Sequence, residues 1–152
     1  MKTFQDLQEG VYDPNILKAF FLAGGPGSGK SYVVKRGTGG LGLKIVNSDD
    51  TFEKYIKDAG LSMKMPKSQE EPRDKLRDRA KAITKMKLDN YVAGRLGLII
   101  DGTGKEYDKI AKQATGLKQL GYDVHMIFVN TSLETALKRN AKRERTVPRS
   151  IA

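Results

Sequence analysis

A glycine-rich run in the first quarter of the chain has the composition of a phosphate-binding loop. It reads Gly24-Gly25-Pro26-Gly27-Ser28-Gly29-Lys30-Ser31 and fits the Walker A pattern. Glycines let the backbone curl so that successive N–H groups face inward as an anion nest. In this pattern the lysine reaches the β- and γ-phosphates, and the next hydroxyl coordinates Mg²⁺. The spacing therefore predicts binding of ATP and Mg²⁺. The alternative is a glycine-rich turn with an incidental lysine. The residues expected to hold the nucleotide are Gly25, Gly27, Ser28, Gly29, Lys30 and Ser31.

Two adjacent carboxylates, Asp49 and Asp50, follow Asn47 and Ser48 at the end of a short apolar run. A carboxylate that faces the γ-phosphate can accept the proton of an attacking hydroxyl and orient that hydroxyl. Asp49 is the candidate for this general base, and Asp50 is a candidate contact to the acceptor, although the two aspartates can exchange these tasks. The alternative is that both aspartates cap a helix that begins at Thr51.

A third carboxylate, Asp101, ends the apolar run Leu98-Ile99-Ile100 and is followed by Gly102, Thr103 and Gly104. This arrangement resembles a Walker B carboxylate, which helps to hold Mg²⁺. We therefore expect Ser31 and Asp101 to be the metal ligands of the protein and Thr103 to be a further contact to the acceptor. A strand-ending aspartate in a glycine turn is the alternative.

Four arginines, Arg139, Arg143, Arg145 and Arg149, gather near the C-terminus. The first two share one face of a predicted helix because they are four residues apart. Guanidinium groups there can stabilise the charge that spreads over a transferring phosphoryl group, and the segment can close as a lid. A solvated basic helix end is the alternative.

The elements that must position these residues are short apolar strands alternating with helices. The predicted strands are 19–23, 43–47, 96–101 and 124–129, and helices are expected at 30–36, 72–95, 107–120 and from Thr131 to 145. The glycine-rich run lies directly after the first strand and opens the first helix, which Gly37 is expected to end. This alternation predicts an α/β fold, a three-layer sandwich with a parallel sheet of four or five strands.

The composition limits the class of protein. A length of 152 residues predicts one domain, 1–152, and 38% apolar with 30% charged residues is typical of a globular chain. Without a membrane span or secretory signal, we expect a cytoplasmic protein with no membrane partner. The absence of Cys excludes disulfides and thiolate metal sites, and His125, within an apolar run, is predicted to be a core residue. Gly37, Gly39 and Gly42 have a dinucleotide-binding spacing, but they precede a strand and so indicate a loop.

With these residues in place, the chain resembles the P-loop kinases that include bacteriophage polynucleotide 5′-kinases and zeta-toxin-like kinases. The resemblance covers about 20–148 and is most specific in 25–31, 47–50 and the run Lys138-Arg139-Asn140-Ala141-Lys142-Arg143, followed by Val147-Pro148. It implies a P-loop NTPase fold, with Asp49 as the general base, Arg139 and Arg143 as lid arginines and Asp101 near the metal. In the polynucleotide kinases an arginine three residues after the catalytic aspartate holds a substrate phosphate, whereas this sequence has Phe52.

These features predict an ATP- and Mg²⁺-dependent phosphotransferase that moves the γ-phosphoryl group to a hydroxyl. The net charge of +10 favours a nucleic-acid substrate, namely the 5′-hydroxyl of a polynucleotide. Phe52 and the zeta-toxin resemblance favour a small-molecule acceptor, such as a nucleotide sugar or nucleoside. An ATP-binding module without transferase activity is a third hypothesis. Because the related kinases continue beyond the position of Ala152, we also expect either a fragment or an unusually short member.

Overall fold

The central element is a four-stranded parallel sheet, seen in a computed structural model that describes residue 13 and residues 15–142. Its strands are β1 (Lys18–Ala23), β2 (Lys44–Val46), β3 (Leu98–Gly102) and β4 (Asp123–Phe128), in the order β2-β3-β1-β4. All three strand pairs are parallel, so the carboxyl ends of the strands meet at one edge. The predicted α/β fold with a parallel sheet is confirmed.

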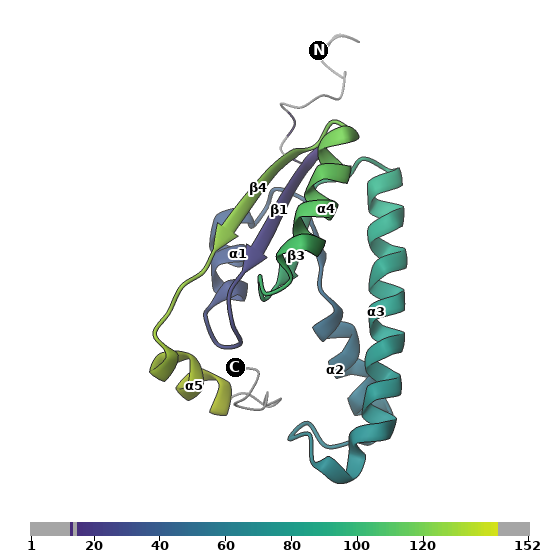
Figure 1. Ribbon diagram of the computed structural model, residues 1–152, viewed down its shortest axis with the longest axis vertical. Helices are drawn as coiled ribbons and strands as arrows, with labels where there is room; N and C mark the ends of the chain where they lie inside the picture. The colour runs from purple at the N-terminus through teal and green to yellow at the C-terminus, as the bar shows by residue number, and fades with distance from the viewer. Residues whose placement is uncertain (1–12, 14, 143–152) are drawn as a thin grey trace.

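Helices connect the strands and cover both faces of the sheet. They are α1 (Lys30–Thr38), α2 (Ser48–Asp58), α3 (Glu70–Ala93), α4 (Tyr107–Gln119) and α5 (Leu133–Ala141), with a short 3-10 turn, η2 (Lys67–Gln69), before α3. Figure 1 shows α3 and α4 on one side of the sheet and α1 behind it. Beyond the carboxyl edge of the strands, α5 and the α2–α3 pair lie on opposite sides. Within the described part of the chain, no helix is both long and apolar enough to cross a membrane.

Two apolar clusters hold this arrangement. The larger one lies on the sheet face that α3 and α4 cover, around Ala19, Phe21 and Leu98. Ile110, Ala114 and Leu117 of α4 join it, as their helical spacing predicts. The smaller cluster lies between α2 and α3, around Phe52, Ile56 and Ala80. The long helix α3 therefore packs on the sheet with its second half and on α2 with its first half.

Several local expectations from the sequence are wrong at the level of single residues. Helix α1 runs through Gly37 to Thr38, whose hydroxyl donates to the Val34 carbonyl oxygen at 2.7 Å, and Gly39 caps it. The cap of α5 is Ser132, not Thr131, because the Ser132 hydroxyl accepts from the Thr135 N–H.

His125 is not a core residue. It lies on β4, which forms an edge of the sheet, and half of its side chain is exposed. The imidazole stacks on the ring of Phe20 with 5.3 Å between ring centroids, and its Nε2 lies 2.9 Å from Oδ2 of Asp123. An edge strand has a neighbouring strand on one side only, so its side chains are less covered than those of a central strand. The apolar character of the run does not reveal that this strand lies at the edge.

Candidate active site

The glycine-rich run forms a tight loop between β1 and α1 at the carboxyl edge of the sheet. Gly27 and Gly29 have φ values of 82° and 100°, in the left-handed region that favours glycine. A Cβ atom on Gly24 would come within 2.7 Å of both the Ser28 hydroxyl and the Val129 carbonyl oxygen. A Cβ atom on Gly27 would collide with the carbonyl oxygen of Ala136 in α5. Glycine is therefore required at Gly27 by both the backbone angle and the space available, at Gly29 by the backbone angle, and at Gly24 by the space available.

Lys30 lies across the mouth of this loop. Its Nζ donates to the Gly24 carbonyl oxygen at 2.6 Å and to that of Gly25 at 3.3 Å, and it lies 4.0 Å from Oδ1 of Asp101. Ser28 is 7% exposed, and its hydroxyl oxygen is buried without a hydrogen-bond partner among the described residues. A buried hydroxyl, the N-terminus of α1 and a lysine ammonium group around one loop are the donors that a chain of phosphates requires. The local geometry fits a nucleotide polyphosphate.

Asn47 connects the ends of two strands, a role that the sequence did not indicate. It follows β2, and its Nδ2 donates to Oδ2 of Asp101, at the end of β3, at 3.1 Å. Its Oδ1 accepts from the Asp49 N–H at 2.8 Å and so caps α2. The aspartates are therefore not the cap of this helix, because Asp49 and Asp50 lie in its first turn. An asparagine directly before the helix could have signalled the cap, because this residue type is favoured there, but not the bond to Asp101.

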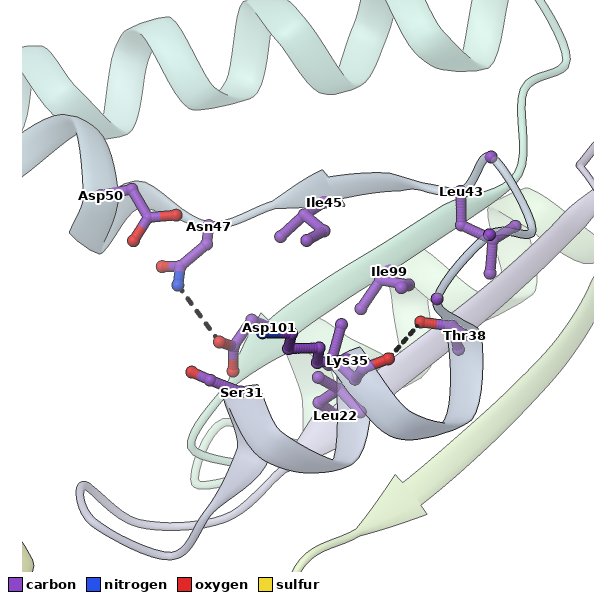
Figure 2. A pocket seen from close by; sticks show the side chains of 14 residues that line it. Leu22, Ser31, Lys35, Thr38, Leu43, Ile45, Asn47, Asp50, Ile99 and Asp101 are labelled. Carbon is purple, nitrogen blue, oxygen red and sulfur yellow. Dashed lines mark hydrogen bonds between the residues drawn. The ribbon is translucent and has the colours of Figure 1, made fainter.

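A cavity of about 740 Å³ lies beside the loop, between α1 and strands β2 and β3. Ser31, Asn47, Asp50 and Asp101 line one end of it, and Figure 2 shows the four side chains gathered there. The rest is lined by Lys35, Thr38, glycines and apolar side chains, the last being Leu22, Val34, Leu43, Ile45 and Ile99. The structure thus brings Asp50 together with Ser31 and Asp101, whereas Asp49 is not among the lining residues. Thr103 is exposed beyond β3 and is also not part of this cavity.

Helix α5 docks on the phosphate-binding loop through Arg139. Its Nη1 donates to the Gly27 carbonyl oxygen at 3.4 Å, although the two residues are 112 positions apart in the sequence. The buried side of α5 also carries Ala136, next to Gly27. One of the predicted lid arginines is therefore at the loop. The others, Arg143, Arg145 and Arg149, lie outside the described residues.

Within the described residues, no group of three or more His, Asp or Glu side chains is arranged to hold a metal ion. Mg²⁺ in phosphoryl-transfer sites is usually held by one or two protein oxygens together with substrate phosphates and water. The hydroxyl of Ser31 and the carboxylate of Asp101, at one end of the cavity, form a donor set of this kind. The residues present fit a magnesium ion that arrives with a nucleotide.

Solved structures with the same fold include proteins of three kinds. A candidate kinase from Chloroflexus aurantiacus superposes with a TM-score of 0.62 at 16% identity, covering 80% of this chain and 64% of that one. A structure from the PezAT chromosomal toxin–antitoxin system of Streptococcus pneumoniae gives a TM-score of 0.59 at 21% identity, covering 82% of this chain and 51% of that one. A chain of the Pnkp1/Rnl/Hen1 RNA repair complex gives a TM-score of 0.64 at 18% identity, covering 98% of this chain and 44% of that one. The chain thus spans 44–64% of the length of these three structures.

The sequence itself carries the stronger relationship. None of the curated proteins matches it significantly. The family model described as zeta toxin, however, matches residues 5–152, which is nearly the whole chain. The phosphate-binding loop, the capped helix α2 and the docked helix α5 all lie within the matched range, and the chain therefore belongs to the zeta toxin family.

Proposed function

We propose that this chain is an ATP-dependent phosphotransferase that moves the γ-phosphoryl group of ATP to a hydroxyl acceptor. The observation that carries the proposal is the meeting of Lys30 and Asp101, 4.0 Å apart, with the capped first turn of α2 at one edge of the sheet. A binding-only module needs the loop and the lysine. It does not need a carboxylate, here that of Asp101, oriented beside them by a hydrogen bond from Asn47.

In the proposed reaction, the backbone N–H groups of the loop and Lys30 hold the β- and γ-phosphates. The acceptor oxygen attacks the γ-phosphorus, the bond from that phosphorus to the bridging oxygen of ADP breaks, and Asp49 takes the proton of the acceptor hydroxyl. Arg139 stabilises the charge on the transferring group from the side of α5. Mg²⁺, held by Ser31 and Asp101, would neutralise phosphate charge when bound.

Two classes of acceptor have separate support. The net charge of +10 favours a polynucleotide 5′-hydroxyl. The basic surface of α3 is partly neutralised, however, because Lys75 pairs with Glu71 and Lys85 with Asp89. A cavity of about 740 Å³ that ends at Asp50 is of the size that encloses small ligands, which favours a nucleoside or a nucleotide sugar.

The test is transfer from γ-labelled ATP to 5′-hydroxyl oligonucleotides, nucleosides and nucleotide sugars, at low and high salt. Lys30→Ala should abolish transfer to any acceptor. Asp49→Asn should leave ATP affinity intact and slow transfer about 100-fold, the scale expected for loss of a general base. Asp58→Asn, at the exposed end of the same helix, is the matched control.

The outcomes separate the hypotheses. A loss of transfer in Asp50→Asn, with Asp49→Asn unaffected, would assign the base to Asp50. Binding of ATP without transfer to any acceptor would contradict the kinase hypothesis and favour an ATP-binding module. Transfer to oligonucleotides that weakens steeply with salt would identify a polynucleotide acceptor, because such an acceptor releases counterions on binding.

A further inference from the structure

Two arginines of α3, Arg73 and Arg77, are partly buried without an anionic partner among residues 13 and 15–142. The Arg77 guanidinium lies over the ring of Phe52, with 4.8 Å from its Cζ to the ring centroid. Arg73 makes one long hydrogen bond, from Nη1 to the Pro66 carbonyl oxygen at 3.4 Å. The Nε atoms of both arginines are buried and have no hydrogen-bond partner among the described residues. In the same part of the chain, neither arginine takes part in an ion pair with a carboxylate.

This arrangement leaves the two Nε–H donors unused at atoms that are buried. A guanidinium carries five N–H donors along the edges of its plane, while stacking on an aromatic ring occupies only its face. Burying such a group without an anion is unfavourable, so a buried arginine normally has a carboxylate or phosphate partner. Arg79 provides the contrast, because it stacks on Tyr55 at 4.9 Å but is exposed and can be solvated.

The pair is linked to the helix that carries the proposed base. Arg73 and Arg77 are four residues apart and share one face of α3. Phe52, beneath Arg77, is three residues after Asp49 in α2, so the two side chains lie on the same face of that helix, about 5 Å apart along its axis. Arg77 therefore stacks on a residue that lies about one helical turn from the carboxylate that is proposed to deprotonate the acceptor.

We propose that Arg73 and Arg77 form an anion subsite for the acceptor, which is a hydroxyl compound carrying a phosphate group near the reacting hydroxyl. This inference rests on the proposed function, because it places the phosphate of the acceptor relative to Asp49. The shared chemistry is a phosphate bound edge-on by guanidinium N–H groups. Two kinds of acceptor could supply this phosphate. One is a polynucleotide, through the 3′-phosphate of its terminal nucleotide, and the other is a nucleotide sugar, through its diphosphate.

The experiment measures binding, so it does not depend on turnover. The phosphate-binding loop is first saturated with a non-hydrolysable ATP analogue and Mg²⁺, which keeps it from competing for the probe. Calorimetry then compares thymidine with thymidine 3′-monophosphate, and glucose with UDP-glucose. The wild-type protein should bind the phosphorylated member of at least one pair about tenfold more tightly or better, the effect expected of a charge-assisted hydrogen bond. The pair that shows the preference identifies the source.

Variants assign the preference to the arginines. Arg77→Gln and Arg73→Gln should each reduce the preference to about twofold or less, as loss of a charge-assisted bond requires. Arg79→Gln, the stacked but exposed arginine of the same helix, should retain it. Circular dichroism checks that the Arg77→Gln variant folds. If that variant does not fold, Arg73→Gln serves as the test, because the Arg73 side chain does not stack on Phe52.

No preference in the wild-type protein, or a preference that survives both Arg73→Gln and Arg77→Gln, overturns the subsite. Failure of the proposed function has a different signature, since Lys30-dependent transfer from labelled ATP would then be absent with every acceptor while the arginine-dependent preference remained. Transfer without any such preference would leave the kinase standing and remove the subsite.

Discussion

Asn47 shows how one side chain can couple a helix to the carboxylate at the end of a neighbouring strand. Its Oδ1 caps α2 through the Asp49 N–H, and its Nδ2 donates to Asp101. The first bond stabilises the helix that carries Asp49 and Asp50. The second fixes the orientation of a carboxylate that lies 4.0 Å from Lys30. The position of α2 and the geometry of Asp101 therefore depend on the same amide.

Two substitutions at this residue separate stability from catalysis. Asn47→Ala removes both hydrogen bonds and should lower the free energy of unfolding by about 1–2 kcal/mol, the usual effect of losing an N-cap. Asn47→Ser keeps a capping oxygen, so its stability in urea should remain close to wild type. Alanine has no donor, and the serine hydroxyl is one bond shorter than the amide nitrogen that donates to Asp101, so both variants should slow phosphoryl transfer at saturating ATP to a similar degree. Full transfer in Asn47→Ser would mean that only the cap matters.

At the scale of elements, the sequence pattern predicted the four strands and helices α1, α3, α4 and α5. Helix α2 entered only as the helix that the aspartates would cap in the alternative interpretation, and the pattern did not indicate which elements pair at long range. The spacing of Leu76, Ala80 and Tyr91 is typical of one apolar face on a helix. It did not reveal that Leu76 and Ala80 pack on α2 whereas Tyr91 packs on the sheet. The partner of Phe52 was missed for the same reason, because Arg77 reaches that ring only through the α2–α3 pairing.

The glycine-rich loop was the part of the site most open to prediction, since all of its parts are contiguous in sequence. Its strand, turn and helix follow one another within 18–38, and local backbone preferences decide the conformation. The contact between Arg139 and Gly27 spans 112 positions and depends on how α5 docks, which spacing alone does not determine. The lid role of Arg139 therefore stays a prediction that only a functional assay can test.

Arg139→Lys tests that role at the level of the docked helix. Lysine keeps the charge but loses the planar fork with which arginine holds phosphoryl oxygens. Turnover should therefore fall, while the affinity for ATP, measured separately by equilibrium titration, changes less. Lys138→Gln is the matched control, because this neighbouring side chain is exposed and pairs with Glu134 on the same helix. Unchanged turnover in Arg139→Lys would mark the residue as a packing contact of α5.

On the scale of the whole molecule, Tyr122 ties the strand β4 to the start of β3. It is 4% exposed, belongs to the larger apolar cluster, and its hydroxyl donates to the Leu96 carbonyl oxygen at 2.7 Å. Burial raises the pKa of this phenol above its ordinary value of 10.0, and the positive charge of Arg95 offsets part of that rise. Folding therefore favours the protonated phenol, so ionisation of this one group opposes the fold.

The consequence is a loss of stability in alkaline solution that can be assigned to this group. Below pH 10 the phenol is protonated in both states, and its contribution to the free energy of unfolding is fully present. As the pH rises past 10, the unfolded chain releases the proton first, and stability falls until the pH passes the raised pKa of the folded state.

Tyr122→Phe should be about 1 kcal/mol less stable at pH 8, because it loses one hydrogen bond, but its stability should fall less between pH 10 and 11. Urea unfolding at pH 8, 10 and 11 measures this difference, with Tyr107→Phe, at a residue that is 78% exposed, as the control. If the wild-type and Tyr122→Phe curves run parallel above pH 10, the alkaline loss arises from other groups, and the buried hydroxyl serves only as a packing and hydrogen-bonding contact.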